Sequence, residues 1–184
     1  MSTGTIVQYC APTLAGLKAG SLFSYHMHMG DQEDLAASIE ELNERLADKG
    51  VRFVIMKRCR GIVLVYAYRT NRLQAILSDD EVREFLQEYG YVDFEIDSCL
   101  NRLGERLMQE DFPHDIGVFL DYPLADIKAF ITNKGCNCPC SGCWKAYTNV
   151  REAEKKFKSF KECTEIYCQN LRAGVDISRL TVAG

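Results

Sequence analysis

The chain has 184 residues, 47% of them hydrophobic, and a formal net charge of −4. This length suits one compact domain with its own core, so we expect a single domain over residues 1–184. The negative charge and the scattered Lys and Arg residues argue against a phosphate-binding surface, so we expect no nucleic-acid partner. The apolar segment 62–67 is too short to cross a bilayer, so we expect no membrane partner.

Nine cysteines are present, an odd number and a high one for this length. The first eleven residues lack the basic region and apolar run of a secretion signal, so we expect a cytoplasmic location. Cysteines are normally reduced there. Free thiols, metal ligands or redox groups are therefore expected rather than a disulfide scaffold.

In the first half of the chain, residues 6–10 are expected to form a short strand, followed by a loop with a helical turn. Leucine and isoleucine at helical spacing predict a helix over 35–46, ended by Gly50. Residues 51–57 alternate and residues 62–68 are almost continuously apolar. These two segments predict an antiparallel hairpin at the centre of a sheet, with the second strand covered on both faces.

The second half is expected to be mainly helical. Ser78 and Glu81 form a capping-box pattern before a helix that Gly90 ends, and a further helix is expected over 96–107. Short helices are expected to begin near Pro113 and Pro123. After a short strand over 144–147, the longest helix is expected over 149–174. The fold class is therefore α+β, a mostly helical single domain with a small antiparallel sheet.

A cysteine-rich loop over residues 135–147 carries the strongest chemical signal. Its sequence is Gly-Cys-Asn-Cys-Pro-Cys-Ser-Gly-Cys-Trp-Lys-Ala-Tyr. Thiolates bind zinc, copper(I) and iron well because sulfur is soft and charged. A candidate metal site, with zinc or iron as cofactor, therefore consists of Cys136, Cys138, Cys140 and Cys143. A redox role, or a loop without special chemistry, remains an alternative.

A second candidate site pairs Cys10 with His114 as catalytic residues. Cys10 precedes Ala-Pro-Thr-Leu-Ala-Gly, and a cysteine between an apolar strand and a turn is a typical place for a nucleophile. His114 follows Pro113 at an expected helix start and would serve as the base. The alternatives are a buried thiol and a histidine that caps the turn. His26 and His28 alternate, but two polar residues on an exposed edge explain them.

Three stretches together resemble a known family: Cys-Ala-Pro-Thr-Leu-Ala-Gly-Leu-Lys at 10–18, Phe-Pro-His-Asp-Ile-Gly-Val-Phe-Leu-Asp-Tyr-Pro at 112–123, and Trp-Lys-Ala-Tyr at 144–147. They are similar to DUF3793, a domain-of-unknown-function family of anaerobic Firmicutes, over nearly the whole chain. The resemblance implies an anaerobic bacterial cytoplasm and no defined activity. Members of the family typically carry a histidine just before the position of Cys10. This chain has Tyr9 there, which weakens the hypothesis that a neighbouring histidine activates Cys10.

Three functional hypotheses follow. The first is a thiol-rich protein that binds a soft metal or takes part in redox chemistry, with a redox or metal-delivery protein as partner. The second is a hydrolase or transferase with Cys10 as nucleophile and His114 as base. The third is a non-catalytic interaction protein. The sequence does not decide whether the protein is an enzyme.

Overall fold

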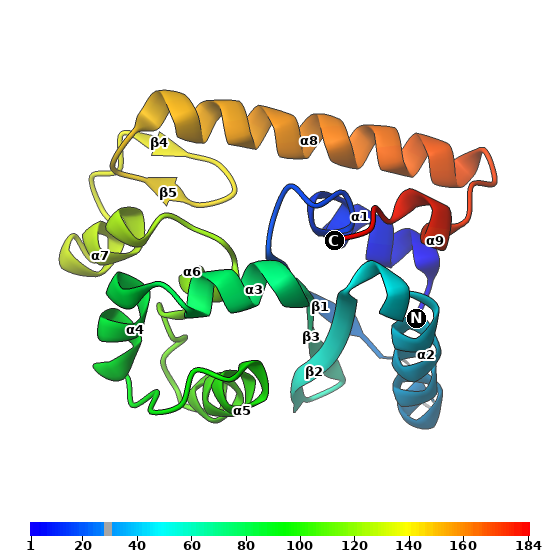
Figure 1. Cartoon of the computed structure of the whole chain (residues 1–184), viewed down its shortest axis with the longest axis horizontal. Coiled ribbons are helices and arrows are strands. Elements are labelled where there is room, and N and C mark those ends of the chain that lie inside the picture. The colour runs from blue at the N-terminus through cyan, green and yellow to red at the C-terminus, as the bar shows by residue number, and fades with distance from the viewer. Residues whose placement is uncertain (28–30) are drawn as a thin grey trace.

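The computed structural model describes the chain except for residues 28–30, and the side chains of residues 28–34 are not described. It is an α+β fold with a three-stranded antiparallel sheet and a separate two-stranded one. The elements, in chain order (Figure 1), are α1 (Thr3–Leu14), β1 (Gly20–His26), α2 (Asp31–Arg45), η1 (Ala47–Lys49), β2 (Val51–Cys59), β3 (Ile62–Arg69), α3 (Thr70–Leu77), α4 (Asp80–Gln87), α5 (Ile96–Leu107), α6 (Ile116–Phe119), α7 (Leu124–Thr132), β4 (Cys140–Ser141), β5 (Lys145–Ala146), α8 (Val150–Arg172) and α9 (Ile177–Leu180).

The main sheet has the strand order β1-β3-β2. The predicted hairpin is confirmed, because β2 and β3 pair antiparallel from Val51↔Arg69 to Cys59↔Ile62. Arg60 and Gly61 join the two strands. Both residues have positive φ, which a two-residue hairpin turn needs if its twist is to match that of the strands. Only β3 is central, however. The prediction that both strands lie at the centre is wrong, because β1 joins the far side of β3 and leaves β2 at the edge.

Strand β3 separates two hydrophobic cores. Val63, Val65 and Ala67 face a core shared with α1, α2 and α9. Tyr66 and Tyr68 face the opposite core, which α3, α4, α5 and α6 complete. Side chains alternate between the two faces of a strand, so an almost continuously apolar segment serves both cores.

Residues 6–10, expected as a strand, lie instead inside helix α1. Ser2 caps this helix by accepting a hydrogen bond from the Thr5 amide. Ile6, Cys10 and Leu14 are spaced by four residues and are all buried, which is a helical stripe. Pro12 suggested a turn. It lies inside the last turn of the helix, which ends two residues later at Leu14.

The helix predicted over 35–46 corresponds to α2, and Gly50, with φ +67°, ends the following 3₁₀ turn. The capping box is wrong. Ser78 ends α3 and donates to the Gln74 carbonyl, whereas Asp79 caps α4 by accepting from the Val82 amide. A carboxylate is as good an N-cap as a hydroxyl, so the start of the helix moves by one residue.

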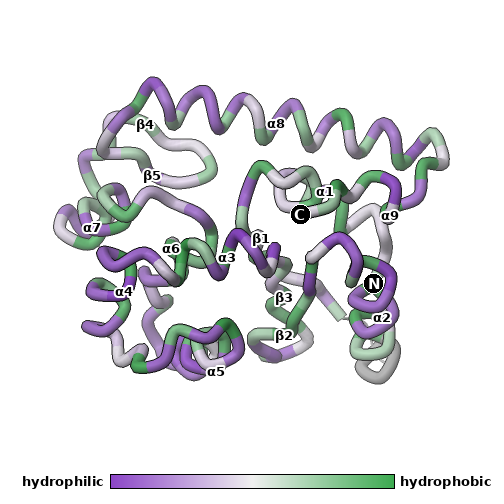
Figure 2. The backbone as a smooth tube through the Cα atoms, viewed as in Figure 1, coloured by the Kyte–Doolittle hydropathy of each residue, from purple (hydrophilic) through white to green (hydrophobic). Residues whose placement is uncertain are grey.

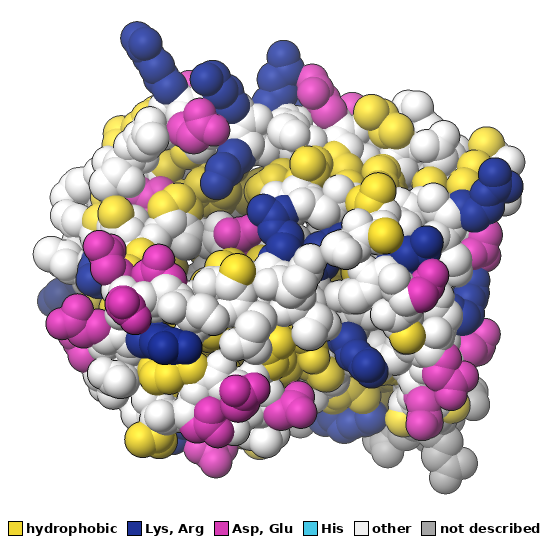
Figure 3. All heavy atoms as spheres, in the orientation of Figure 1, with side chains coloured by type: hydrophobic (Ala, Val, Ile, Leu, Met, Phe, Trp, Pro, Cys, Tyr) yellow, Lys and Arg dark blue, Asp and Glu magenta, His cyan; other side chains and the backbone are white. Residues whose placement is uncertain are grey.

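Helix α8 confirms the longest predicted helix and crosses one side of the whole molecule, from the β4–β5 hairpin to α9 (Figure 1). Its hydrophilic and hydrophobic residues alternate along the tube in Figure 2, as an amphipathic helix requires. Ala153, Phe160 and Cys163 are buried, and the helix packs against α1. Figure 3 shows Lys and Arg side chains on its outer side and hydrophobic side chains along its inner edge.

Candidate functional site

The cysteine-rich loop is held in place by one buried carboxylate. Asp126, in the first turn of α7, is 2% exposed. Its Oδ2 accepts from the Trp144 indole at 2.8 Å, and its Oδ1 accepts from the Tyr147 amide and from the Thr148 amide and hydroxyl. Burial by itself would raise the pKa of Asp126, but these hydrogen bonds together lower it below its ordinary value. The carboxylate is thus an ionised anchor for the strand that follows the cysteines.

Aromatic rings hold the other side of the hairpin. Trp144 stacks on Tyr122 and meets Phe157 of α8 edge-on, with ring centroids 5.2 and 4.5 Å apart. The Tyr122 hydroxyl donates to the Cys143 carbonyl at 2.9 Å. A Cβ at Gly142 would overlap the Phe157 ring, so only glycine lets the hairpin lie this close to α8.

All four thiols of the loop are free in the structure. Cys136 and Cys143 are exposed, and Cys138 and Cys140 are half-buried. Within the described part of the chain, no three His, Cys, Asp or Glu side chains are grouped so as to hold one metal ion. The four cysteines proposed as metal ligands are therefore neighbours in sequence that do not converge in this conformation.

Cys143 stands apart from the other three because it shares a cavity with Lys18. This cavity, of about 440 Å³, lies between α1 and α8 and also exposes Gln8, Tyr9 and Glu165. The Lys18 ammonium lies 5.2 Å from the centre of the Tyr122 ring, the same ring whose hydroxyl binds the Cys143 carbonyl. A thiol and an amine, the two strongest nucleophiles among ordinary side chains, therefore line the same cavity.

The two groups change each other's protonation. Burial lowers the pKa of Lys18, while the neighbouring Cys143, Asp121 and Cys10 raise it in part. Burial raises the pKa of Cys143, and the positive charge of Lys18 lowers it. Each group thus favours the charged form of the other, in a place where burial favours both neutral forms.

Cys10 and His114 lie in different parts of the molecule. Cys10 lies on the buried side of α1 and is fully buried in the core, and burial raises the pKa of its thiol far above the ordinary range. That shift is the opposite of what activates a nucleophile. His114 is exposed and lies edge-on to Phe130, at the rim of a different cavity. The proposed catalytic pair therefore gains no support from the geometry.

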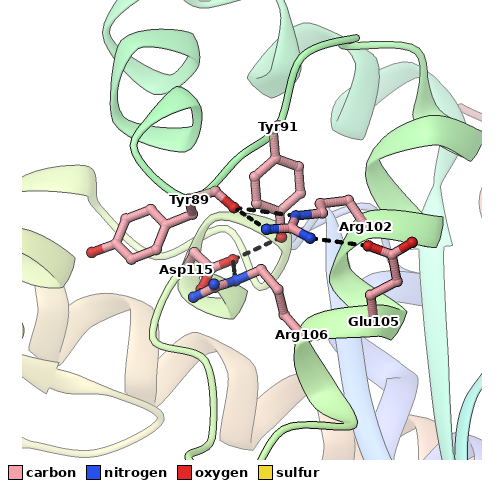
Figure 4. Close-up of polar contacts among 6 residues, drawn as sticks. All are labelled: Tyr89, Tyr91, Arg102, Glu105, Arg106 and Asp115. Atoms are coloured by element: carbon pink, nitrogen blue, oxygen red, sulfur yellow. Dashed lines mark hydrogen bonds and ion pairs between the residues drawn. The ribbon is translucent and has the colours of Figure 1, made fainter.

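The segment that carries His114 is fixed by a buried ion pair next to it. Asp115 is fully buried. Its carboxylate accepts two hydrogen bonds from the Arg106 guanidinium, at 2.8 and 2.9 Å, and one from the Tyr91 hydroxyl, at 2.7 Å (Figure 4). Arg102 binds the Tyr89 carbonyl beside this cluster. These contacts tie the residues before α6, next to His114, to α5.

A second cavity, of about 410 Å³, lies between the segment before α7, helix α7 and the β4–β5 hairpin. Its walls are mainly aromatic and aliphatic, with Phe130, Ile127 and Trp144 among them. Its polar groups are His114, Lys145, Ser141 and the fully bonded Asp126. The hairpin therefore has a cavity on each side. Cys143 lines one of them, and the other has mainly apolar walls.

Sequence reasoning missed Lys18, Tyr122 and Asp126 as parts of the site. No local pattern marks them, because each acts through residues that are distant in sequence. One signal was available, however. Lys18, Tyr122 and Trp144 each belong to one of the three stretches 10–18, 112–123 and 144–147 that carry the family resemblance. Those three stretches meet at the hairpin.

Residues 6–181 match the family model described as protein of unknown function (DUF3793). The chain belongs to the DUF3793 family. The resemblance seen in the three stretches is thus confirmed, and the match extends over nearly the whole chain. Comparison with curated proteins and with solved structures finds no match.

None of the helices in the described residues is both long and apolar enough to cross a bilayer.

His26 ends β1, whereas His28, its partner in the alternating pair, lies outside the described residues.

Proposed function

We propose that this DUF3793 protein is a thiol-dependent redox protein whose reactive pair is Cys140 and Cys143. The observation that carries the proposal is the shared cavity of Cys143 and Lys18. The sequence Cys-Ser-Gly-Cys at 140–143 adds a second thiol at the C-x-x-C spacing of dithiol motifs. Both cysteines lie on one short hairpin, Cys140 in β4 and Cys143 in its turn.

The two thiols have different surroundings, which assigns them different roles. Burial raises the pKa of Cys143 overall, but the positive charge of Lys18 offsets part of that rise and the thiol is exposed, so we assign it as the attacking thiol. Cys140 is half-buried against Trp144 and Phe157, so it is the thiol that resolves the intermediate. The positive charge of Lys18 stabilises the Cys143 thiolate once it forms.

The proposed substrate is a disulfide, either in a protein partner or in a small molecule. The Cys143 thiolate attacks one sulfur of that disulfide and forms a mixed disulfide, and the first substrate thiolate leaves and is protonated. The Cys140 thiolate then attacks the Cys143 sulfur, which closes the Cys140–Cys143 disulfide and releases the second substrate thiol. Two electrons and two protons pass from the protein to the substrate.

Glutathione disulfide added to the fully reduced protein without oxygen tests this proposal. We expect a Cys140–Cys143 disulfide, identified by peptide mass spectrometry, together with free glutathione. Cys143→Ser should abolish the reaction, whereas Cys59→Ser should leave it unchanged, because Cys59 is an exposed thiol on β2, outside the cavity. A disulfide between other cysteines, or a Cys143→Ser protein that still oxidises at the original rate, would contradict the proposal.

Soft-metal binding by Cys136, Cys138, Cys140 and Cys143 is a second proposal, supported by four free thiols within eight consecutive residues. It requires the loop to rearrange, because the thiols do not converge in this conformation. Zinc or iron(II) should then bind near stoichiometrically, raise the thermal stability and change the Trp144 fluorescence. Cys138→Ser should abolish this binding and Cys59→Ser should not. Unchanged stability and fluorescence on metal addition would refute it.

A further inference from the structure

We propose that the apolar cavity beside the β4–β5 hairpin binds a small carboxylate with an aromatic or similarly bulky apolar body. The cavity volume of about 410 Å³ falls in the range of small-molecule sites. Nothing in the thiol chemistry proposed above uses this cavity, because Cys143 opens into the other one. The inference therefore stands on its own observations.

The apolar part of the ligand is inferred from the walls. Ile127 and Phe130 of α7 form one wall, Trp144 of the hairpin another, and Phe112 lies at the rim with 56% of its surface exposed. Flat rings are good partners for such a surface because they stack or meet it edge-on. An exposed aromatic residue next to a mainly apolar hollow is typical of a site that a ligand covers.

The carboxylate is inferred from the polar groups, which can donate but offer few acceptors. Lys145 donates one hydrogen bond to the Gly135 carbonyl at 2.7 Å, so two of its three N–H donors remain for a ligand. His114 and Ser141 supply an imidazole and a hydroxyl on the same lining. Lys145 lies 5.8 Å and His114 5.0 Å from the centre of the Phe130 ring, so both flank one apolar surface.

The one acid on the lining does not contradict an anionic ligand. Both oxygens of Asp126 already accept hydrogen bonds, from Trp144, Tyr147 and Thr148. Its negative charge is therefore compensated by fixed donors behind the cavity wall. Lys145 supplies a positive charge at the rim, and a carboxylate is the small group that matches it.

Trp144, the only tryptophan of the chain, lines the cavity and reports binding by fluorescence. The probes are phenylacetate and 4-phenylbutyrate, each compared with its neutral amide of nearly the same shape. We expect a saturable fluorescence change with the carboxylates and affinity about tenfold weaker for the amides, the difference between a charged and a neutral hydrogen-bond partner. No saturable change, or equal affinities for acid and amide, would overturn the proposal.

Variants locate the interaction. Lys145→Met should remove the preference for acid over amide, and Lys145→Arg should keep it, which separates loss of charge from loss of fold. Lys155→Met is the matched control, because Lys155 lies on the outer side of α8 and pairs with Glu152. Cys143→Ser should still bind phenylacetate, so failure here and failure of the thiol proposal are distinguishable. A Lys145→Met protein that keeps the preference would refute the proposal.

Discussion

Lys18 is an uncommon lysine, because its amine is half-buried next to a thiol rather than extended into water. The ring of Tyr122 and the thiol of Cys143 are its neighbours, together with Asp121. A buried amine loses hydration and holds its proton less tightly, which makes lysine adaptable as a base or nucleophile. At this position its positive charge also lowers the pKa of Cys143, against the larger effect of burial.

Lys18→Met should slow alkylation of Cys143 by iodoacetamide at pH 7–8. The folded-state pKa of Cys143 is raised by burial and lowered by Lys18, so removing the positive charge raises it further. The thiolate is the reactive form, so the rate should rise with pH in both proteins, with the profile of the variant displaced to higher pH. Peptide mass spectrometry across a pH series measures this shift.

Lys155→Met, on the exposed side of α8, is the control for loss of a lysine and should leave the profile unchanged. If the Lys18→Met and original profiles coincide, the charge of Lys18 does not reach Cys143. The role of Lys18 in the proposed chemistry would then be wrong.

At the scale of elements, α8 joins the thiol loop to the rest of the fold. Its first turns pack on the hairpin through Ala153 and Phe157, and its later turns pack on α1. Phe160 is 9% exposed, whereas Phe157 is only partly buried. Helix α8 therefore forms one wall of the cavity that Cys143 and Lys18 also line.

Phe160→Ala should lower the free energy of unfolding by about 3–5 kcal/mol, the usual cost when a buried aromatic side chain is removed from a core. Phe157→Ala should cost less, because that ring keeps more contact with solvent. Urea denaturation followed by circular dichroism measures both. Lys156→Ala, on the same helix but exposed, is the control. Equal, small losses for all three variants would show that α8 does not pack as described.

At the scale of the whole molecule, a few long-range contacts join parts that lie far apart in sequence. Arg69, at the end of β3, is 2% exposed and donates to the carbonyls of Thr13, Leu14 and Val182. It therefore binds the end of α1, the sheet and the C-terminal residues together. The two cores also lie on opposite faces of β3, so the same strand joins them.

We therefore predict that residues 1–184 unfold as a single domain, in one cooperative transition. Trp144 fluorescence reports the hairpin end, and far-ultraviolet circular dichroism reports the helices throughout the chain. The two urea curves should coincide within error, as two-state unfolding requires. Separate midpoints would show that the hairpin end and the main sheet are independent units.

Features that depend on local periodicity were determined by the sequence alone. The stripe along residues 149–174 predicts α8, and the alternation in 51–57 followed by the apolar run 62–68 predicts the β2–β3 hairpin, because a helix or a strand repeats its side-chain directions at a fixed interval. The α+β class follows from these elements. The strand predicted over residues 6–10 is wrong, because Pro12 indicates a turn there, although the spacing of Ile6, Cys10 and Leu14 is helical.

Which cysteine has reactive surroundings was decided only by the tertiary structure. The sequence presents Cys136, Cys138, Cys140 and Cys143 as equals, and only folding brings Lys18 across more than a hundred residues to Cys143. Folding likewise buries Cys10, which the sequence presented as a nucleophile. A pKa depends on burial and on nearby charge, and both are set by residues that are close in space and distant along the chain.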